Sequence, residues 1–286
     1  MRRPLALVLA GLVAAAAAGR AMADDRVSAA GEVSGSDRPP AAGRPEAAPR
    51  WTFREACRTF AADGLYLVSF PARTRVKGAW VAAGVAAATA LAIHRDEEIR
   101  AQVLEADGRP ARRTATKFEP LGRYEVAAAA LGTLYLIGRG TGDARLASTA
   151  ATAFESYLWA GIFTSVAKGA FGRERPGRGS GKGRFFAGDT IFPSGHTARS
   201  FAIAAVLADR HGRKAAFIAY PLAALIGLST VEEDTHWASD VIAGAGLGLA
   251  IGKGIAARHP PAAPVHAGAS FQVVPGRGGA ALRIAY

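Results

Sequence analysis

Three short blocks in the second half of the chain combine basic, hydroxyl, imidazole and carboxylate side chains at spacings that suit phosphate-ester chemistry. The first block contains Lys168 and, before a proline, Arg175. A guanidinium can grip a phosphate through two parallel hydrogen bonds, so this block predicts an anion clamp. The second block offers Ser194, the backbone N–H of Gly195 and His196, and it is expected to open a helix. A hydroxyl and an amide can donate to phosphate oxygens, and an imidazole can transfer a proton near neutral pH.

The third block contains His236 and Asp240, an i, i+4 pair. The carboxylate is expected to hold one imidazole nitrogen protonated and to leave the other free to attack phosphorus. Each block alone also has a simpler explanation. A basic loop can be merely solvated, Ser194 can be only a helix N-cap, and an i, i+4 pair can lie on any helix surface.

Taken in order, the three blocks resemble the tripartite signature of the type 2 phosphatidic acid phosphatase superfamily, which also includes bacterial nonspecific acid phosphatases and vanadium haloperoxidases. The resemblance covers roughly residues 60–258. It implies a helical bundle and phosphate-ester hydrolysis that needs no metal. It also implies that His236 forms a phosphohistidine, that Asp240 orients it, and that His196 protonates the leaving alkoxide and later activates water.

The same resemblance assigns phosphate binding to Lys168, Arg175, Ser194 and the backbone N–H of Gly195. These groups would stabilise the phosphoryl oxygens as negative charge shifts in the transition state.

One position departs from the family pattern, in which the third block begins Ser-Arg. Here the pair is Ser229-Thr230, so one phosphate-binding cation is missing. Loss of one such donor typically costs about 10²–10³ in rate. Arg199, one turn after His196, and Arg173 are the two residues that we expect could replace it.

Three functions stay open at this point. The first is a phosphatase that hydrolyses a phosphomonoester or a lipid pyrophosphate, with membrane lipid as the favoured substrate class and no cofactor. The second is a haloperoxidase that holds vanadate in the same pocket. The third is a noncatalytic binder of phosphate or lipid, in which Thr230 marks lost activity.

The helices that must position these residues are predicted from apolar stretches separated by polar joins. They give an all-α bundle of about six core helices within a domain of residues 51–258, and the expected helices are Gly78–His94, Tyr124–Arg139, Ser148–Lys168, Thr197–Arg210, Lys214–Ser229 and Ala238–Ala257. One or two amphipathic segments are expected over residues 51–77. Residues 95–123, which include Asp96, predict a solvated surface loop.

The two ends of the chain have different compositions. Residues 1–23 predict a cleaved export signal, with an uncleaved anchor as the alternative, and residues 24–50 predict a flexible linker. Residues 259–286 predict a linker followed by a β-hairpin-like tail that turns near Gly276. We therefore expect a protein of the cell envelope, either integral to the membrane or periplasmic.

Several of the apolar stretches approach the roughly twenty residues that a bilayer demands, which favours a membrane protein over a soluble bundle. The net charge of +12 arises from 35 basic and 23 acidic residues that are dispersed along the chain. Because the charge is dispersed and no recognition motif is present, we expect no nucleic-acid binding. Attraction to anionic lipid surfaces or to phosphorylated substrates explains the charge more simply. The oligomeric state is not indicated by the sequence.

Overall fold

The computed structural model describes residues 53–73, 76–105, 117–178, 182–261, 270–276 and 279–285. The predicted export signal and the linker of residues 24–50 lie outside the described residues. The elements are α2 (Phe53–Arg73), α3 (Val76–Glu105), η1 (Glu119–Gly122), α5 (Tyr124–Thr141), α6 (Ala144–Phe171), α7 (Gly195–Glu232), α8 (Ala238–Arg258), β1 (Ser270–Gly276) and β2 (Gly279–Ala285). The predicted fold class, an all-α bundle with a terminal hairpin, is confirmed.

A stripe of small residues lets α8 lie directly against the first half of α7. A Cβ on Gly244, Gly248 or Gly252 would lie 2.6, 2.1 or 2.4 Å from the carbonyl oxygen of Ser194, Ala198 or Ala202, respectively. Both series advance by four residues in the same direction, so the two helices run parallel here. Their N-termini therefore lie at the same end of the bundle, and helix N-termini favour anions.

The second half of α7 folds back against the first half. Gly212 interrupts the helix with φ 71° and ψ −157°, a conformation that glycine adopts most readily. The rings of Phe201 and Tyr220 stack with their centroids 6.2 Å apart, whereas a straight helix would separate these residues by about 28 Å. The two helices predicted on either side of Gly212 are thus the arms of a helical hairpin, which returns Thr230 to the end where α7 begins.

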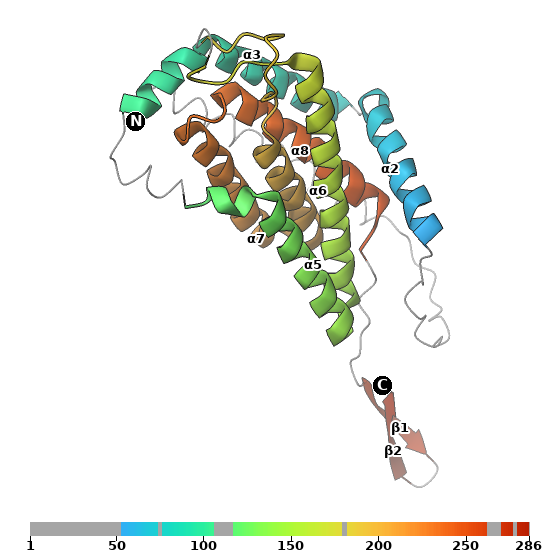
Figure 1. Ribbon diagram of the computed structural model, residues 1–286. Coiled ribbons are helices and arrows are strands. Elements are labelled where there is room, and N and C mark those ends of the chain that lie inside the picture. Colours follow the sequence, from blue (N-terminus) through green and yellow to red (C-terminus); the bar gives the residue numbers. More distant parts are fainter. Residues whose placement is uncertain are drawn as a thin grey trace.

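The prediction of a surface loop for residues 95–123 is wrong in its first part, because α3 continues to Glu105. Asp96, Ile99 and Arg100 lie on one face of this helix, at i, i+3 and i+4. Asp96 is only 3 % exposed and Ile99 only 1 %. This face points into the protein. Its charged residues made the segment resemble a solvated loop in the sequence. Figure 1 shows α3 crossing one end of the bundle, and α3 packs against α8.

A buried acid on α2 holds this helix to the end of α8. The carboxylate of Asp63 is fully buried, accepts from Arg258 and lies 2.8 Å from Nε2 of His259. Among the described residues, Asp63, Glu155 and His259 bring three metal-type ligand atoms within 4.8 Å of one another. Burial and the nearby Asp63 raise the pKa of Glu155 to about 8.

The single helix α2 agrees with the amphipathic segments that were predicted over residues 51–77.

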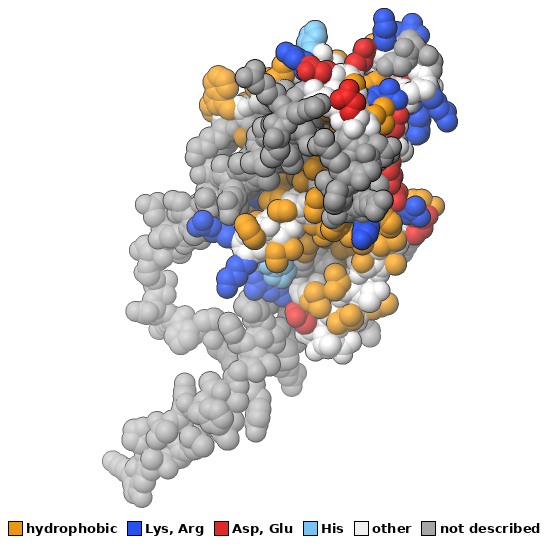
Figure 2. Space-filling model, turned by 90° about the vertical axis from the view of Figure 1, so that its left-hand side faces the viewer, with side chains coloured by type: hydrophobic (Ala, Val, Ile, Leu, Met, Phe, Trp, Pro, Cys, Tyr) orange, Lys and Arg blue, Asp and Glu red, His pale blue; other side chains and the backbone are white. Residues whose placement is uncertain are grey.

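Much of the bundle surface is apolar. Large side chains that are each at least 69 % exposed include Leu65, Trp80, Leu136, Val166, Phe217 and Ile218. Figure 2 shows apolar patches across the middle of one face, with charged side chains crowded at its upper end. By length and composition, α7 and α8 are the two described helices that could cross a membrane, although buried core helices also meet this criterion.

The C-terminal tail forms the expected hairpin. β1 and β2 pair antiparallel, with Ser270 opposite Ala285 and Gly276 opposite Gly279.

We predict that Gly248→Ala destabilises the protein by about 1–3 kcal/mol, the usual cost of overpacking a core, because the added methyl meets backbone atoms of α7. The matched control is Gly132→Ala in α5, where nothing lies within 4 Å of the new methyl. This control should be neutral or stabilising, since alanine favours helices. Unfolding free energies in detergent test the pair, and equal effects would contradict close packing of α7 on α8.

Candidate functional site

The three sequence blocks meet at the end of the bundle where α7 and α8 begin. Ser194 caps α7: its Oγ accepts from the backbone N–H of Thr197 at 3.4 Å and from the Thr197 hydroxyl at 3.0 Å. The backbone N–H of Ser194 donates to the carbonyl oxygen of Asp240 at 3.0 Å. The second block therefore opens a helix, as expected, and is bonded directly to the third.

His236 and Asp240 form a buried pair. Nδ1 of His236 lies 3.3 Å from Oδ2 of Asp240, and the two side chains are 9 % and 0 % exposed. The same carboxylate oxygen accepts from the backbone N–H of Trp237 at 3.0 Å. With Nδ1 directed at the carboxylate, Nε2 is the imidazole nitrogen left for another atom, which is the geometry that a nucleophilic histidine requires.

The turn that carries His236 is held from both sides. The carbonyl oxygen of Thr230 accepts from the backbone N–H groups of Thr235 and His236 at 3.0 and 3.1 Å. Asp234 takes a positive φ of 56°. Its carboxylate accepts hydrogen bonds from Nε and Nη2 of Arg100, at 2.6 and 2.7 Å. Arg100 lies on α3, 134 residues before Asp234, so no local pattern predicts this contact.

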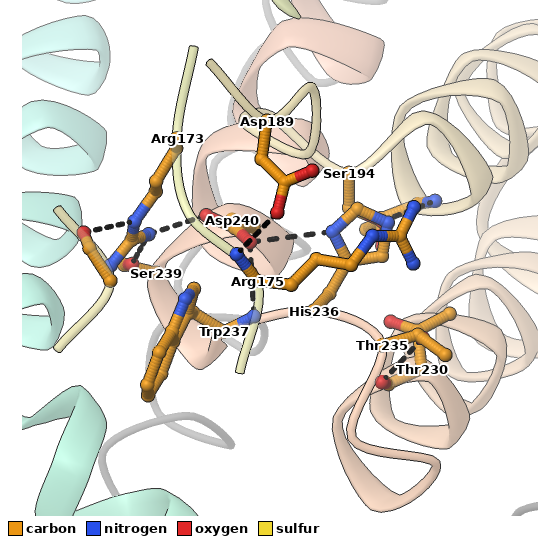
Figure 3. Close-up of polar contacts among 12 residues, drawn as sticks. Arg173, Arg175, Asp189, Ser194, Thr230, Thr235, His236, Trp237, Ser239 and Asp240 are labelled. Carbon is orange, nitrogen blue, oxygen red and sulfur yellow. Dashed lines mark hydrogen bonds and ion pairs between the residues drawn. The ribbon is translucent and has the colours of Figure 1, made fainter. Parts of the chain in front are cut away.

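Thr230 stands where the family pattern has arginine, and it is part of the scaffold. Its side chain is buried and donates to the carbonyl oxygen of Gly227 at 2.7 Å. Figure 3 shows the hydrogen bond from the Thr235 hydroxyl to the carbonyl oxygen of Thr230, which lies away from the contacts around Asp240.

Lys168, Arg175 and Arg199 form a group of basic side chains without ion pairs among the described residues. A Cβ on Gly195 would lie 3.6 Å from Nη1 of Arg199 and 3.8 Å from Nζ of Lys168. Burial lowers the pKa of Lys168 below the ordinary lysine value, and the charges of Arg199 and Arg175 lower it further. Mutual repulsion of this kind is relieved when an anion binds.

The position of Arg199 is set by its neighbours on α6. Its guanidinium lies over the ring of Tyr157, 5.5 Å from the centroid. A Cβ on Gly161 would lie 2.9 Å from Nη2 of Arg199, so the glycine leaves room for the guanidinium. Figure 3 shows the Arg175 side chain running past the His236 ring toward the side where Ser194 lies.

Arg173, the other expected replacement cation, is instead occupied by the protein. It is 1 % exposed, and its Nε donates to the carbonyl oxygen of Gly183 at 3.1 Å. Its two terminal nitrogens donate to Ser239, Asp240 and Asp96. Figure 3 shows Arg173 on the opposite side of Asp240 from the His236 ring.

His196 lies beside this group with its side chain about one third exposed, at 33 %. Its Nε2 is 3.9 Å from Oε1 of Glu119 on η1, and it is close enough to His236 for the two imidazoles to repel each other when both are charged. Glu119 was not predicted, because it lies 77 residues before His196 and belongs to a stretch that resembles a surface loop.

Comparison with known proteins shows what this part of the chain is similar to. The sequence profile of the PAP2 superfamily matches residues 149–262. The chain is 32 % identical over 96 residues to the lipid A 1-phosphatase of Porphyromonas gingivalis (strain ATCC 33277), an alignment that covers 32 % of this chain and 20 % of that relative. The chain thus spans about a fifth of the length of the curated relative that it matches.

A solved structure was also found, the transmembrane PAP2 type phosphatidylglycerolphosphate phosphatase from Bacillus subtilis. It shares 20 % identity, with a TM-score of 0.46, over 70 % of this chain and 94 % of that chain. The profile match covers all three blocks of the site, from Lys168 to Asp240. Residues 149–262 thus match the profile of the PAP2 superfamily, which confirms the resemblance expected from the sequence.

Proposed function

We propose that this protein is a phosphatase that hydrolyses phosphorylated lipids through a phosphohistidine intermediate on His236. The observation that carries the proposal is the contact of Nδ1 of His236 with buried Asp240, beside three basic side chains without ion pairs among the described residues. The pair supplies a nucleophile with its orienting group, and the cations supply a site for a phosphate.

In the first step, Nε2 of His236 attacks phosphorus and the bond from phosphorus to the alcohol oxygen breaks. His196, protonated at the start, gives its proton to the departing alkoxide. Lys168, Arg175 and Arg199 stabilise the phosphoryl oxygens, together with the Ser194 hydroxyl and the backbone N–H of Gly195 at the start of α7. Asp240 stabilises the positive charge that develops on the imidazole of His236.

In the second step, His196, now neutral, takes a proton from a water molecule that attacks the phosphorus. The bond between phosphorus and Nε2 of His236 breaks, and inorganic phosphate leaves. Both histidines then have the protonation states with which the cycle began, so no other reactant is required.

A lipid substrate is supported by the apolar surface of the bundle. Exposed apolar patches of this kind are rare on soluble monomers and mark contact with a membrane or another protein. The curated relative is named for a phosphatase of lipid A, and the solved structure for a transmembrane phosphatase. We therefore place the protein in the membrane of the cell envelope, with the phosphate group of a lipid as its target.

Two other functions of the same pocket are distinguished by experiment. A haloperoxidase would hold vanadate among the same basic residues and would oxidise halide without releasing phosphate. A noncatalytic binder would retain phosphate affinity without turnover, because Thr230 leaves the pocket one cation short. We propose that Arg199 replaces the cation that is missing at position 230, since Arg173 is bonded within the protein.

We predict that His236→Ala lowers phosphate release at least about a thousandfold, as expected when a nucleophile is removed. The measurement is release from phosphatidic acid, a lipid pyrophosphate and an aryl phosphate, with His211→Ala on the exposed part of α7 as control. With a substrate that carries a radiolabelled phosphate, the label should be trapped on the wild type and on the His211→Ala control but not on His236→Ala. Phosphate binding without release by the wild type would instead support the noncatalytic binder.

We predict that Arg199→Ala lowers kcat/KM by about 10²–10³, the usual effect of one lost phosphate donor. Arg213→Ala, an exposed arginine on the same helix, should leave kcat/KM unchanged. If both variants behave like the wild type, Arg199 does not replace the missing arginine.

We predict that the affinity for inorganic phosphate falls as the pH rises toward the ordinary lysine pKa of about 10.4, in a range where ordinary histidines are already neutral. The lowered pKa of Lys168 means that its ammonium is lost at a lower pH than that of an ordinary lysine. Binding is therefore complete below the pKa of Lys168 and weakens as the pH passes it. Lys168→Arg, which stays charged, should flatten this dependence in calorimetric titrations. An unchanged slope would remove Lys168 from the phosphate site.

A further inference from the structure

We infer that Asp96 and Arg173 are positioning residues for the catalytic pair, because they continue the contact of His236 with Asp240 into a buried chain of four groups that ends on α3. This inference rests on the proposed function, since it assigns roles within the same site. Asp96 lies 140 residues before His236 and outside the three sequence blocks.

The chain of contacts is continuous. Oδ2 of Asp96 accepts from Nη2 of Arg173 at 2.7 Å. Nη1 of Arg173 donates to Oδ1 of Asp240, and the other oxygen of Asp240 faces Nδ1 of His236. The side chains of Asp96, Arg173 and Asp240 are 4, 1 and 0 % exposed, so water does not compete for these bonds.

Asp96 also fixes the first turn of α8. Its Oδ1 accepts from the backbone N–H of Ser239 at 3.0 Å, and its Oδ2 accepts from the hydroxyl of Ser239. Every one of these contacts has a donor pointing at an oxygen of Asp96, as an ionised carboxylate requires. Ser239 in turn accepts from Arg173 at 2.6 Å, so α3, the loop after α6 and the start of α8 are locked together.

The walls around Arg173 allow little movement. Its guanidinium lies 4.7 Å from the ring centroid of Phe185 and 5.5 Å from that of Trp237. A Cβ on Gly183, which has φ of 60°, would lie 3.0 Å from Nη2 of Arg173 and 2.8 Å from the Trp237 ring. The guanidinium is therefore enclosed by aromatic rings and backbone, and it can serve as a fixed support for Asp240.

The charges in this chain explain why Asp96 matters for His236. Arg173 stands between two carboxylates, and both attract its single positive charge. If Asp96 loses its charge, Arg173 interacts with Asp240 alone and weakens the pull of Asp240 on the proton at Nδ1 of His236. Among buried groups such changes are felt strongly, because the local dielectric constant is low.

The test is Asp96→Asn, which keeps the shape of the side chain and removes its charge. We expect kcat on an aryl phosphate to fall about tenfold or more, with KM nearly unchanged. This is the usual scale for residues that orient a directly acting side chain. Glu98→Gln is the matched control, because Glu98 lies on the same helix and pairs with Arg95 in solvent. Ser239→Ala, which removes only the hydroxyl bonds, should lower kcat less and covers the case in which Asp96→Asn does not fold.

A second readout does not depend on turnover. In protein labelled with ¹⁵N-histidine, the ring nitrogens of His236, assigned by their loss in His236→Ala, should indicate one tautomer with the proton on Nδ1. Asp96→Asn should shift these signals toward a mixture of tautomers, whereas Glu98→Gln should not.

The outcomes separate this inference from the proposed function. If the wild type releases no phosphate from any substrate, the proposed function fails, and the tautomer measurement still decides whether Asp96 acts on His236. If the wild type is active and a folded Asp96→Asn protein keeps its kcat and its tautomer, the inference is overturned. Lower thermal stability with unchanged kcat and tautomer would likewise reduce Asp96 to a structural role.

Discussion

The buried carboxylate of Asp240 is the group on which the rest of the site depends. Its side chain receives Arg173 from the first block and faces His236 in the third, and its backbone carbonyl accepts from Ser194 in the second. A carboxylate with no exposed surface is costly to bury unless its oxygens are bonded. The need to satisfy this carboxylate joins the first block to the third, and the backbone carbonyl of the same residue joins the second block to them.

The two arginines of the first block have opposite fates although they are only two residues apart. Arg173 turns inward and donates to four protein groups, whereas Arg175 extends past His236 and has no ion pair among the described residues. The inward arginine bonds to the carboxylate of Asp240, and the outward one adds to the positive charge around Lys168. Under the proposed function, a single short loop would support the nucleophile and also bind the anion that it attacks.

The sequence predicted the features that depend on neighbours along the chain. The helices, the cap at Ser194 and the pairing of His236 with Asp240 all follow from local spacing. Asp96 was assigned to a solvated loop because its neighbours are charged, and nothing local identifies its partner Arg173, 77 residues away. The fold-back at Gly212 was expected only as a break between two helices, since a break does not reveal where the next helix goes.

That fold-back determines from which side the protein can be reached. The first half of α7 carries His196 and Arg199 at its start, and the second half returns to the same end, where the turn with His236 follows. Figure 1 shows the loop after α6 at this end as well. In a bilayer, a hairpin built in this way presents all of its reactive groups to one leaflet. Under the proposed function, lipids of the opposite leaflet would have to change sides before this protein could act on them, so its activity would report the asymmetry of the membrane.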